Sequence, residues 1–162
     1  MKVRAMKVRD QVRIRSAESA DCAELARLRA MLWPEASAEE HRRELEHVLA
    51  GAAAPMPTAI FVAEWENEML VGFLETDLRS HADGCDPSRA VGYIEGWYVL
   101  EGYRRQGIGK SLVTAAEEWA RGEGCREMAS DALIENHSSQ KAHEALGYAV
   151  VDRCVHYRKT LP

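Results

Sequence analysis

The sequence lacks the features that mark a membrane protein or a secreted, disulfide-bonded protein. No stretch approaches the roughly 18 consecutive apolar residues that a membrane-spanning helix needs. The basic N-terminus is followed by no apolar core of a secretory signal. The four cysteines (Cys22, Cys85, Cys125 and Cys154) are widely spaced and include no C-x-x-C pair, which argues against a zinc site and a disulfide framework. We therefore expect a cytoplasmic protein with reduced thiols and no metal.

The chain also has little excess charge. Its 21 Lys and Arg residues stand against 26 Asp and Glu residues, a formal net charge of −5 over 162 residues. A protein that binds a phosphate backbone needs a basic face, so we do not expect a nucleic-acid partner. The length predicts a single domain. We place this domain at residues 12–162. It follows an N-terminal extension, residues 1–11, in which Met-Lys-Val-Arg occurs twice and which we expect to be flexible.

Hydrophobic periodicity predicts an α/β chain in the order β-α-α-β-β-β-α-β-α-β. The expected strands are 12–15, 58–65, 69–78, 93–100, 125–130 and 148–159, and the last two helices are expected at 107–121 and 136–146. The proline after Trp33 ends the first helix, and a capping box from Ser37 to Glu40 begins the second. Strands that alternate with helices in the second half predict some parallel pairing.

A strand, a glycine loop and an amphipathic helix follow one another in the middle of the chain. The strand at 93–100 leads into the loop Arg104-Arg105-Gln106-Gly107-Ile108-Gly109-Lys110. Successive N–H groups at a helix start form a nest for an anion, and the basic side chains add positive charge there. The spacing fits neither a P-loop nor a dinucleotide fingerprint. A lone G-x-G could equally be a plain helix-opening turn, but the flanking strand and helix favour an anion site.

The segment Arg104 to Gly109 resembles the R/Q-x-x-G-x-G/A pyrophosphate loop of the GCN5-related N-acetyltransferases. The order of elements resembles that family over almost the whole chain. Shorter segments resemble one branch, the aminoglycoside 6′-N-acetyltransferases: Leu32-Trp33-Pro34, Gly84-Cys85-Asp86, Glu95-Gly96, the run from Gly124 to Asp131, Glu135-Asn136, Ser139-Gln140-Lys141 and Tyr157-Arg158-Lys159. The resemblance implies the fold of that family, with central parallel strands that splay apart. It also implies direct acetyl transfer from acetyl-CoA to the 6′-amine of an aminoglycoside.

The resemblance also implies how the cofactor is held. The pyrophosphate would bind the backbone from Gln106 to Lys110, and the pantetheine would run along the strand end at Tyr98. The Val99 N–H would then donate to the thioester oxygen as it becomes an oxyanion. The full set implied for the cofactor is Tyr98, Val99, Leu100, Arg104, Arg105, Gln106, Gly107, Ile108, Gly109, Lys110 and Asn136.

Three carboxylates and a tryptophan are expected on the acceptor side. Asp131 follows a strand where parallel α/β sheets bind ligands, and it can accept or relay the amine proton, although it could instead cap the next turn. Glu95 lies between apolar strand residues, so it either binds the substrate or forms a structural ion pair. Asp152 corresponds to an acidic substrate contact of the family or is a solvated strand residue. Trp33 either stacks on a sugar ring or packs in the core.

His143 occupies the position where many members of the family have a tyrosine that protonates the CoA thiolate. A histidine can donate a proton near neutral pH, but a helix histidine can also be purely structural. Ser139, one turn earlier, is an alternative donor. The loop at 80–90 lacks the tyrosine by which relatives contact the substrate. The resemblance further suggests a homodimer in which a neighbouring chain forms part of the substrate wall.

Two other functions stay open at this point. The same fold could acetylate another amine, such as a polyamine or a protein N-terminus, or it could bind acyl-CoA without turnover. The placed charges favour a cationic acceptor, because the basic residues lie in the glycine loop whereas Glu95, Asp131 and Asp152 lie on the acceptor side. Binding that depends on these charges should weaken with added salt.

Overall fold

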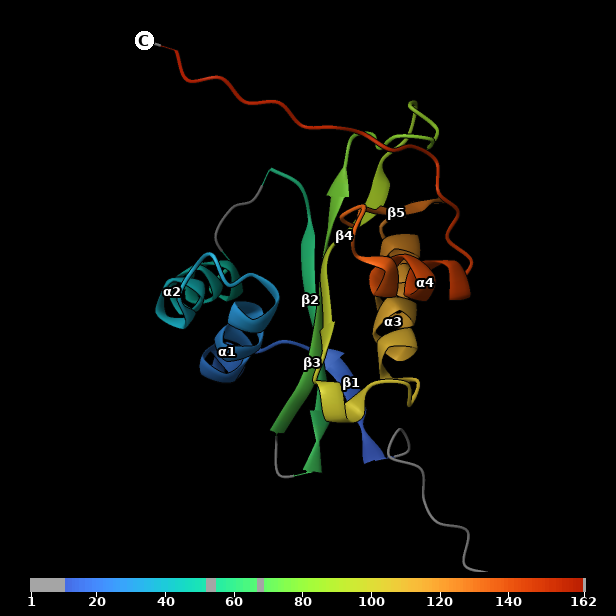
Figure 1. Cartoon of the computed structure of the whole chain (residues 1–162). Coiled ribbons are helices and arrows are strands. Elements are labelled where there is room, and N and C mark those ends of the chain that lie inside the picture. Colours follow the sequence, from blue (N-terminus) through green and yellow to red (C-terminus); the bar gives the residue numbers. More distant parts are fainter. Residues whose placement is uncertain (1–10, 52–54, 67–68, 162) are drawn as a thin grey trace, which may run out of the picture.

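The structure is a computed structural model that describes residues 11–51, 55–66 and 69–161. A mixed five-stranded sheet is covered on one face by α1 (Cys22–Leu32) and α2 (Ala38–Leu49), and on the other by α3 (Ile108–Gly122) and α4 (His137–Ala145) (Figure 1). Two short 3-10 helices, Ser19–Asp21 and Glu101–Tyr103, precede α1 and α3. The N-terminal repeat lies outside the described residues. Among those described, no helix combines the length and the apolar composition needed to cross a membrane.

The sheet has the strand order β1 (Arg13–Ser16), β2 (Thr58–Trp65), β3 (Met69–Arg79), β4 (Val91–Val99) and β5 (Met128–Ser130). The first three pairings are antiparallel, and β4 and β5 are parallel. The parallel ladder joins only Gly92–Ile94 to Met128–Ser130. Beyond Ile94, β4 continues to Val99 while β5 has ended. The predicted parallel pairing is therefore present, and it leaves the last part of β4 without a partner on this side.

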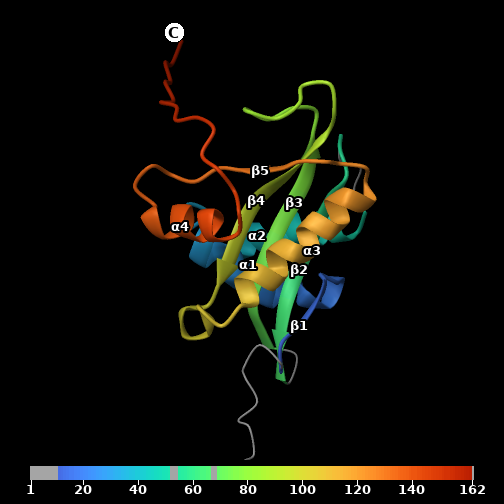
Figure 2. The same cartoon turned by 90° about the vertical axis from the view of Figure 1, so that its right-hand side faces the viewer.

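The central strand β3 is buried on both faces because helices lie on each side of it. Phe73 packs with Leu25, Leu28 and Leu45 on the side of α1 and α2. Leu74 packs on the opposite side with the apolar stripe of α3. Such a strand reads as a nearly continuous apolar run in the sequence, as 69–74 does. α3 lies diagonally across its face of the sheet, with α4 beside it (Figure 2).

Local sequence signals placed the helix ends correctly. The Ser37 N–H donates to Glu40 Oε2 (2.8 Å), and the Glu40 N–H donates to Ser37 Oγ (3.2 Å), which is the predicted capping box. α1 ends at Leu32, directly before Trp33 and its proline. These signals are correct because both are local: the capping box uses hydrogen bonds between residues three apart, and a proline restricts the backbone of the residue before it.

The expected last strand, 148–159, is wrong for the single chain. This segment contains no helix or strand, and it runs along the domain and then away from it (Figures 1 and 2). A strand obtains its hydrogen bonds from a neighbouring strand, and the sheet order within the described residues contains no partner for this one. The strand expected at 125–130 is also shorter, because the Cys125 N–H donates to Ala120 O at the end of α3 (2.9 Å) instead of joining the ladder.

Candidate active site

The gap between β4 and β5 presents a backbone N–H at the expected catalytic position. The Leu100 N–H donates to Val71 O of β3 at 2.9 Å. Because N–H groups alternate in direction along an antiparallel strand, the Val99 N–H points away from β3, into the space beyond the end of β5. The Val99 carbonyl accepts a hydrogen bond from Arg104 Nε at 2.8 Å. The Val99 N–H thus has the orientation that an oxyanion donor requires.

The glycine loop ends in a helix start with unpaired N–H groups. Gly107, at φ +88°, is the N-cap of α3, and the first helical hydrogen bond runs from the Ser111 N–H to Gly107 O. The N–H groups of Ile108, Gly109 and Lys110 therefore have no acceptor within the helix. They form the nest expected for an anion, at the positive end of the helix dipole.

Gly109 is required by packing as well as by the loop. A Cβ at this position would lie 2.8 Å from Cζ2 of Trp97, so only a glycine lets the helix start approach β4 this closely. Beside the loop, the Arg104 guanidinium lies 5.4 Å from the Tyr98 ring centre. Arg105 takes a positive φ of 60°, and Gln106 Nε2 donates to Gly102 O at 3.1 Å. Asn136 caps α4, because its Oδ1 accepts from the Ser139 N–H at 3.0 Å.

His143 connects α4 to the end of β5. Its Nδ1 lies 2.8 Å from Ser139 O. A carbonyl can only accept, so Nδ1 carries a proton. Its Nε2 lies 3.0 Å from Ser130 Oγ, and Ser130 is the last residue that β5 pairs with β4. The imidazole packs edge-on against Trp97. Sequence reasoning missed Ser130, although it stands in the longest segment of the family resemblance.

On the other face of the sheet, Asp131 is held by a tyrosine. The Tyr93 hydroxyl donates to Asp131 Oδ1 at 2.8 Å. Burial and the Asp131 carboxylate both raise the pKa of Tyr93, so the phenol stays protonated and remains the donor. The pair fixes the Asp131 carboxylate just beyond β5. The sequence did not suggest Tyr93, because the two residues are 38 positions apart.

Glu95 is part of an ion pair, one of the two alternatives left open by the sequence. Arg79 Nε donates to Glu95 Oε1 at 3.1 Å, and Arg79 Nη2 is in still closer contact with the same oxygen. The Arg79 guanidinium also lies over the Tyr93 ring, 3.3 Å from its centre. Arg79 Nε is 3.8 Å from Asp77 Oδ1. Neither Asp77 nor Arg79 was predicted to belong to the site.

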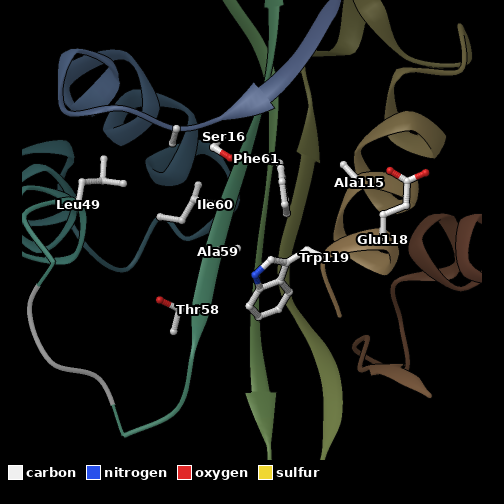
Figure 3. A pocket seen from close by; sticks show the side chains of 10 residues that line it. Ser16, Leu49, Thr58, Ala59, Ile60, Phe61, Ala115, Glu118 and Trp119 are labelled. Atoms are coloured by element: carbon white, nitrogen blue, oxygen red, sulfur yellow. The ribbon is translucent and has the colours of Figure 1, made fainter. Parts of the chain in front are cut away.

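Of these side chains, Asp77 and Glu95 line a cavity of about 150 Å³ between α2 and the sheet. Its acidic wall consists of Glu75, Asp77 and Glu95, and Arg29 of α1 lies beside them. A larger hollow, of about 500 Å³, follows the part of β2 beyond β1, with Phe61 and Trp119 on one side and Leu49 and Ile60 on the other (Figure 3). It is lined by none of the residues expected to bind the cofactor or the acceptor, whereas the smaller cavity is lined by Glu95.

Trp33 and Asp152 differ in how far the fold supports their expected roles. The Trp33 ring lies against Gly96, next to Glu95, and it also packs edge-on against Phe73, with 6.0 Å between ring centres. It therefore belongs to the core and borders the acceptor side. Asp152 is exposed in the C-terminal segment, where its Oδ1 accepts from the N–H of the next residue. The neighbouring Val151 touches Gly84 in the β3–β4 loop. Within one chain, Asp152 is not brought to the cavity.

The described residues contain no group of three His, Cys, Asp or Glu side chains arranged to hold a metal ion. The four cysteines are unpaired, with Cys22 and Cys125 buried.

The fold, the parallel pair of β4 and β5 and the glycine loop define the class of protein. Residues 24–148 match the acetyltransferase (GNAT) family, and the chain belongs to that family. GNAT enzymes use acetyl-CoA as the acetyl donor. The three free N–H groups at the start of α3 fit its pyrophosphate.

Several relatives of high similarity belong to one branch. An aminoglycoside N(6′)-acetyltransferase type 1 of Klebsiella aerogenes is 40% identical over 148 residues, covering 91% of this chain and 96% of the relative. The enzyme of that name from Serratia marcescens is 44% identical over 135 residues, covering 83% and 89%. The structure of AAC(6′)-Iy in complex with the bisubstrate analogue CoA-S-monomethyl-acetylneamine has a TM-score of 0.81 and 35% identity, and covers 93% of this chain and 99% of the other.

The contact between Gly96 and Trp33 generates a first prediction. A Cβ on Gly96 would overlap the Trp33 ring, so Gly96→Ala should displace the ring from the acceptor side. We expect the KM for the acceptor to rise by about tenfold, equivalent to ~1.4 kcal/mol of binding, with a change in tryptophan fluorescence. Acetyl-CoA binding, measured by calorimetry, should not change.

Gly122→Ala is a matched control, because a Cβ at Gly122 meets no atom within 4 Å. Equal KM values for the acceptor in Gly96→Ala and the wild type would contradict a role for the Trp33 ring in the site.

Proposed function

We propose that this protein is an acetyl-CoA-dependent aminoglycoside 6′-N-acetyltransferase and so confers resistance to these antibiotics. The observation that carries the proposal is the 40% identity to an aminoglycoside N(6′)-acetyltransferase over 91% of the chain. The site agrees with it. A helix start suited to an anionic donor follows β4, and the same strand contributes Glu95 to a carboxylate-lined cavity suited to a cationic acceptor.

Residues of this chain can stabilise the oxyanion, accept the proton of the amine and protonate the thiolate. Acetyl-CoA, when bound, supplies an acetyl group activated as a thioester. The amine nitrogen attacks the carbonyl carbon, and the Val99 N–H donates to the oxygen as it becomes negative. The C–S bond then breaks. Asp131, held by Tyr93, accepts the proton that the amine loses, directly or through water. Ser130 Oγ gives its proton to the CoA thiolate, and His143, protonated on Nε2 as well as on Nδ1, replaces it.

The acceptor's remaining ammonium groups are held by carboxylates. Glu95 borders the cavity, and Asp131 stands beyond the end of β5. Trp33 offers a ring edge beside Gly96 for the apolar face of a sugar. Asp152 joins this set only if it is delivered by the C-terminal segment of a neighbouring chain. We also propose that the protein works in the cytoplasm, where its four unpaired thiols would stay reduced.

A thiol-release assay with kanamycin, spermidine and a peptide N-terminus tests both the reaction and the acceptor. We expect CoA release with kanamycin, and 6′-acetylation when the product is analysed by NMR. Asp131→Ala should lower kcat by roughly a hundredfold or more, because the amine proton loses its acceptor. Acetyl-CoA affinity should stay close to the wild-type value.

Each alternative function has its own result in this assay. If spermidine or the peptide is acetylated and kanamycin is not, the protein is an N-acetyltransferase for another amine. If the protein binds acetyl-CoA but acetylates none of these amines, it is a non-catalytic acyl-CoA sensor. Unchanged kcat in Asp131→Ala would remove the role given to that carboxylate.

A relay through Ser130 and His143 predicts non-additive losses. His143→Gln and Ser130→Ala should each reduce kcat, by roughly ten- to a hundredfold, because both interrupt the same proton path. The kcat of the double variant should be no lower than that of the more impaired single variant. Ser139→Ala should reduce kcat less than either change, because it removes the Ser139 Oγ contact with His143 Nδ1 at 3.3 Å but keeps the shorter contact with the Ser139 backbone carbonyl at 2.8 Å. Additive losses in stopped-flow turnover would mean that the two residues act independently.

We propose in addition that the protein is a homodimer that uses its C-terminal segment. Val151, Val155 and Tyr157 are exposed and alternate along the segment as one face of a strand does, and Tyr157 is 93% exposed. A second copy would cover these side chains and place Asp152 in the partner's site. Sedimentation equilibrium at micromolar concentration should give twice the chain mass, and Val155→Lys should shift it toward one chain mass. A wild-type monomer over the whole range would refute the dimer.

A further inference from the structure

We propose that Arg79 is a specificity-determining residue of the acceptor site, because its guanidinium occupies the place of a substrate ammonium beside Asp77 and Glu95. A polycationic acceptor would displace it, and Asp77 would then become a ligand of the incoming ammonium. The inference rests on the proposed function and adds two residues to its site.

The contacts of Arg79 are those of a cation bound in an ammonium subsite. Its guanidinium pairs with Glu95 and lies over the face of Tyr93, an electron-rich surface that attracts cations. An acceptor ammonium bound at Glu95 would meet a carboxylate whose Oε1 already accepts from two nitrogens of Arg79. The two cations therefore compete for one carboxylate.

Arg79 makes no hydrogen bond to Asp77, the second carboxylate beside it. Asp77 Oδ1 is buried and has no hydrogen-bond partner among the described residues, and the nearest guanidinium nitrogen is 3.8 Å away. Burial, followed by the charge of Glu95, raises the pKa of Asp77 to about 6. Arg79 lowers that pKa by less than these two effects raise it. A further cation in the cavity would stabilise the charged form of Asp77.

The neighbouring charges supply no such cation. Across the cavity wall, Arg29 is committed to Glu75, with 2.8 Å between Arg29 Nε and Glu75 Oε1, and it also reaches Glu44 of α2. Arg79 thus faces both Asp77 and Glu95, and the cavity keeps an excess of negative charge. This excess suits a ligand that carries more than one positive charge.

Arg79 can leave without disturbing the fold. Its side chain is 40% exposed and lies at the last residue of β3, so it can turn toward solvent. The Tyr93–Asp131 hydrogen bond involves none of its atoms, so the proton acceptor stays in place when the arginine moves. Because displacement costs the Arg79–Glu95 interaction, a monoamine gains less from the exchange than an acceptor that also contacts Asp77 and Asp131. Arg79 would thereby favour polycationic acceptors.

Steady-state kinetics of Arg79→Gln with kanamycin test this competition. We expect the KM for kanamycin to fall by about fivefold, the upper end of what an exposed ion pair contributes, and kcat/KM to rise in the same proportion. Discrimination between kanamycin and a simple monoamine should shrink. Asp77→Asn should raise the KM for kanamycin while leaving acetyl-CoA affinity unchanged.

Arg89→Gln is the matched control for net charge. Arg89 lies in the β3–β4 loop, 3.7 Å from Asp86, and its loss changes the charge by the same amount. An equal fall in KM with Arg89→Gln would assign the effect to long-range electrostatics. A higher KM or a lower kcat in Arg79→Gln would show that Arg79 positions Glu95 and Tyr93, and would overturn the proposal. A wild-type enzyme inactive toward every aminoglycoside would instead refute the proposed function.

Discussion

The site depends on the short parallel ladder between β4 and β5. These strands are joined over three residue pairs, whereas β3 holds β4 along most of its length. β4 therefore stays extended to Val99 with one edge open. A backbone edge with free N–H groups on a buried strand is ordinarily an unfavourable feature, because its polar groups lack partners. Under the proposed function, the open edge would give its hydrogen bonds to the pantetheine arm of the donor, which has an extended shape and amide groups.

The basic glycine loop and the carboxylates of the site lie toward opposite ends of β4. The start of α3 and the glycine loop follow β4 directly, so the positive end of a helix dipole lies near the Val99 end of the strand. The carboxylates lie toward the other end of β4, near Tyr93 and Glu95. The net charge of −5 is summed over the whole chain and describes neither of these two regions. An anionic donor and a cationic acceptor can each approach a surface of opposite sign.

Signals within a few residues made the helices and the glycine loop predictable from the sequence. The capping box of α2, the Trp33-Pro34 stop and Gly107 as the cap of α3 all depend on neighbours in the chain. The Arg79–Glu95 and Tyr93–Asp131 contacts could not be predicted in this way, because they join residues 16 and 38 positions apart through sheet register. The last strand failed for a related reason. Its alternating pattern is real, but a pattern supplies no partner strand.

A bulge in β4 links the two halves of the site. Glu75 pairs with Gly96 and Thr76 with Ile94, so Glu95 is an extra residue without a partner on β3. The insertion shifts the alternation of all later side chains by one. Gly96 therefore faces Trp33, and Trp97 faces Gly109 and His143 on the opposite side. Strict alternation would instead place Trp97 on the side of α1 and leave α3 without the indole that Gly109 contacts. One added residue thus places Glu95 at the acidic cavity and Trp97 against the glycine loop, so the register of this strand sets both halves of the proposed site.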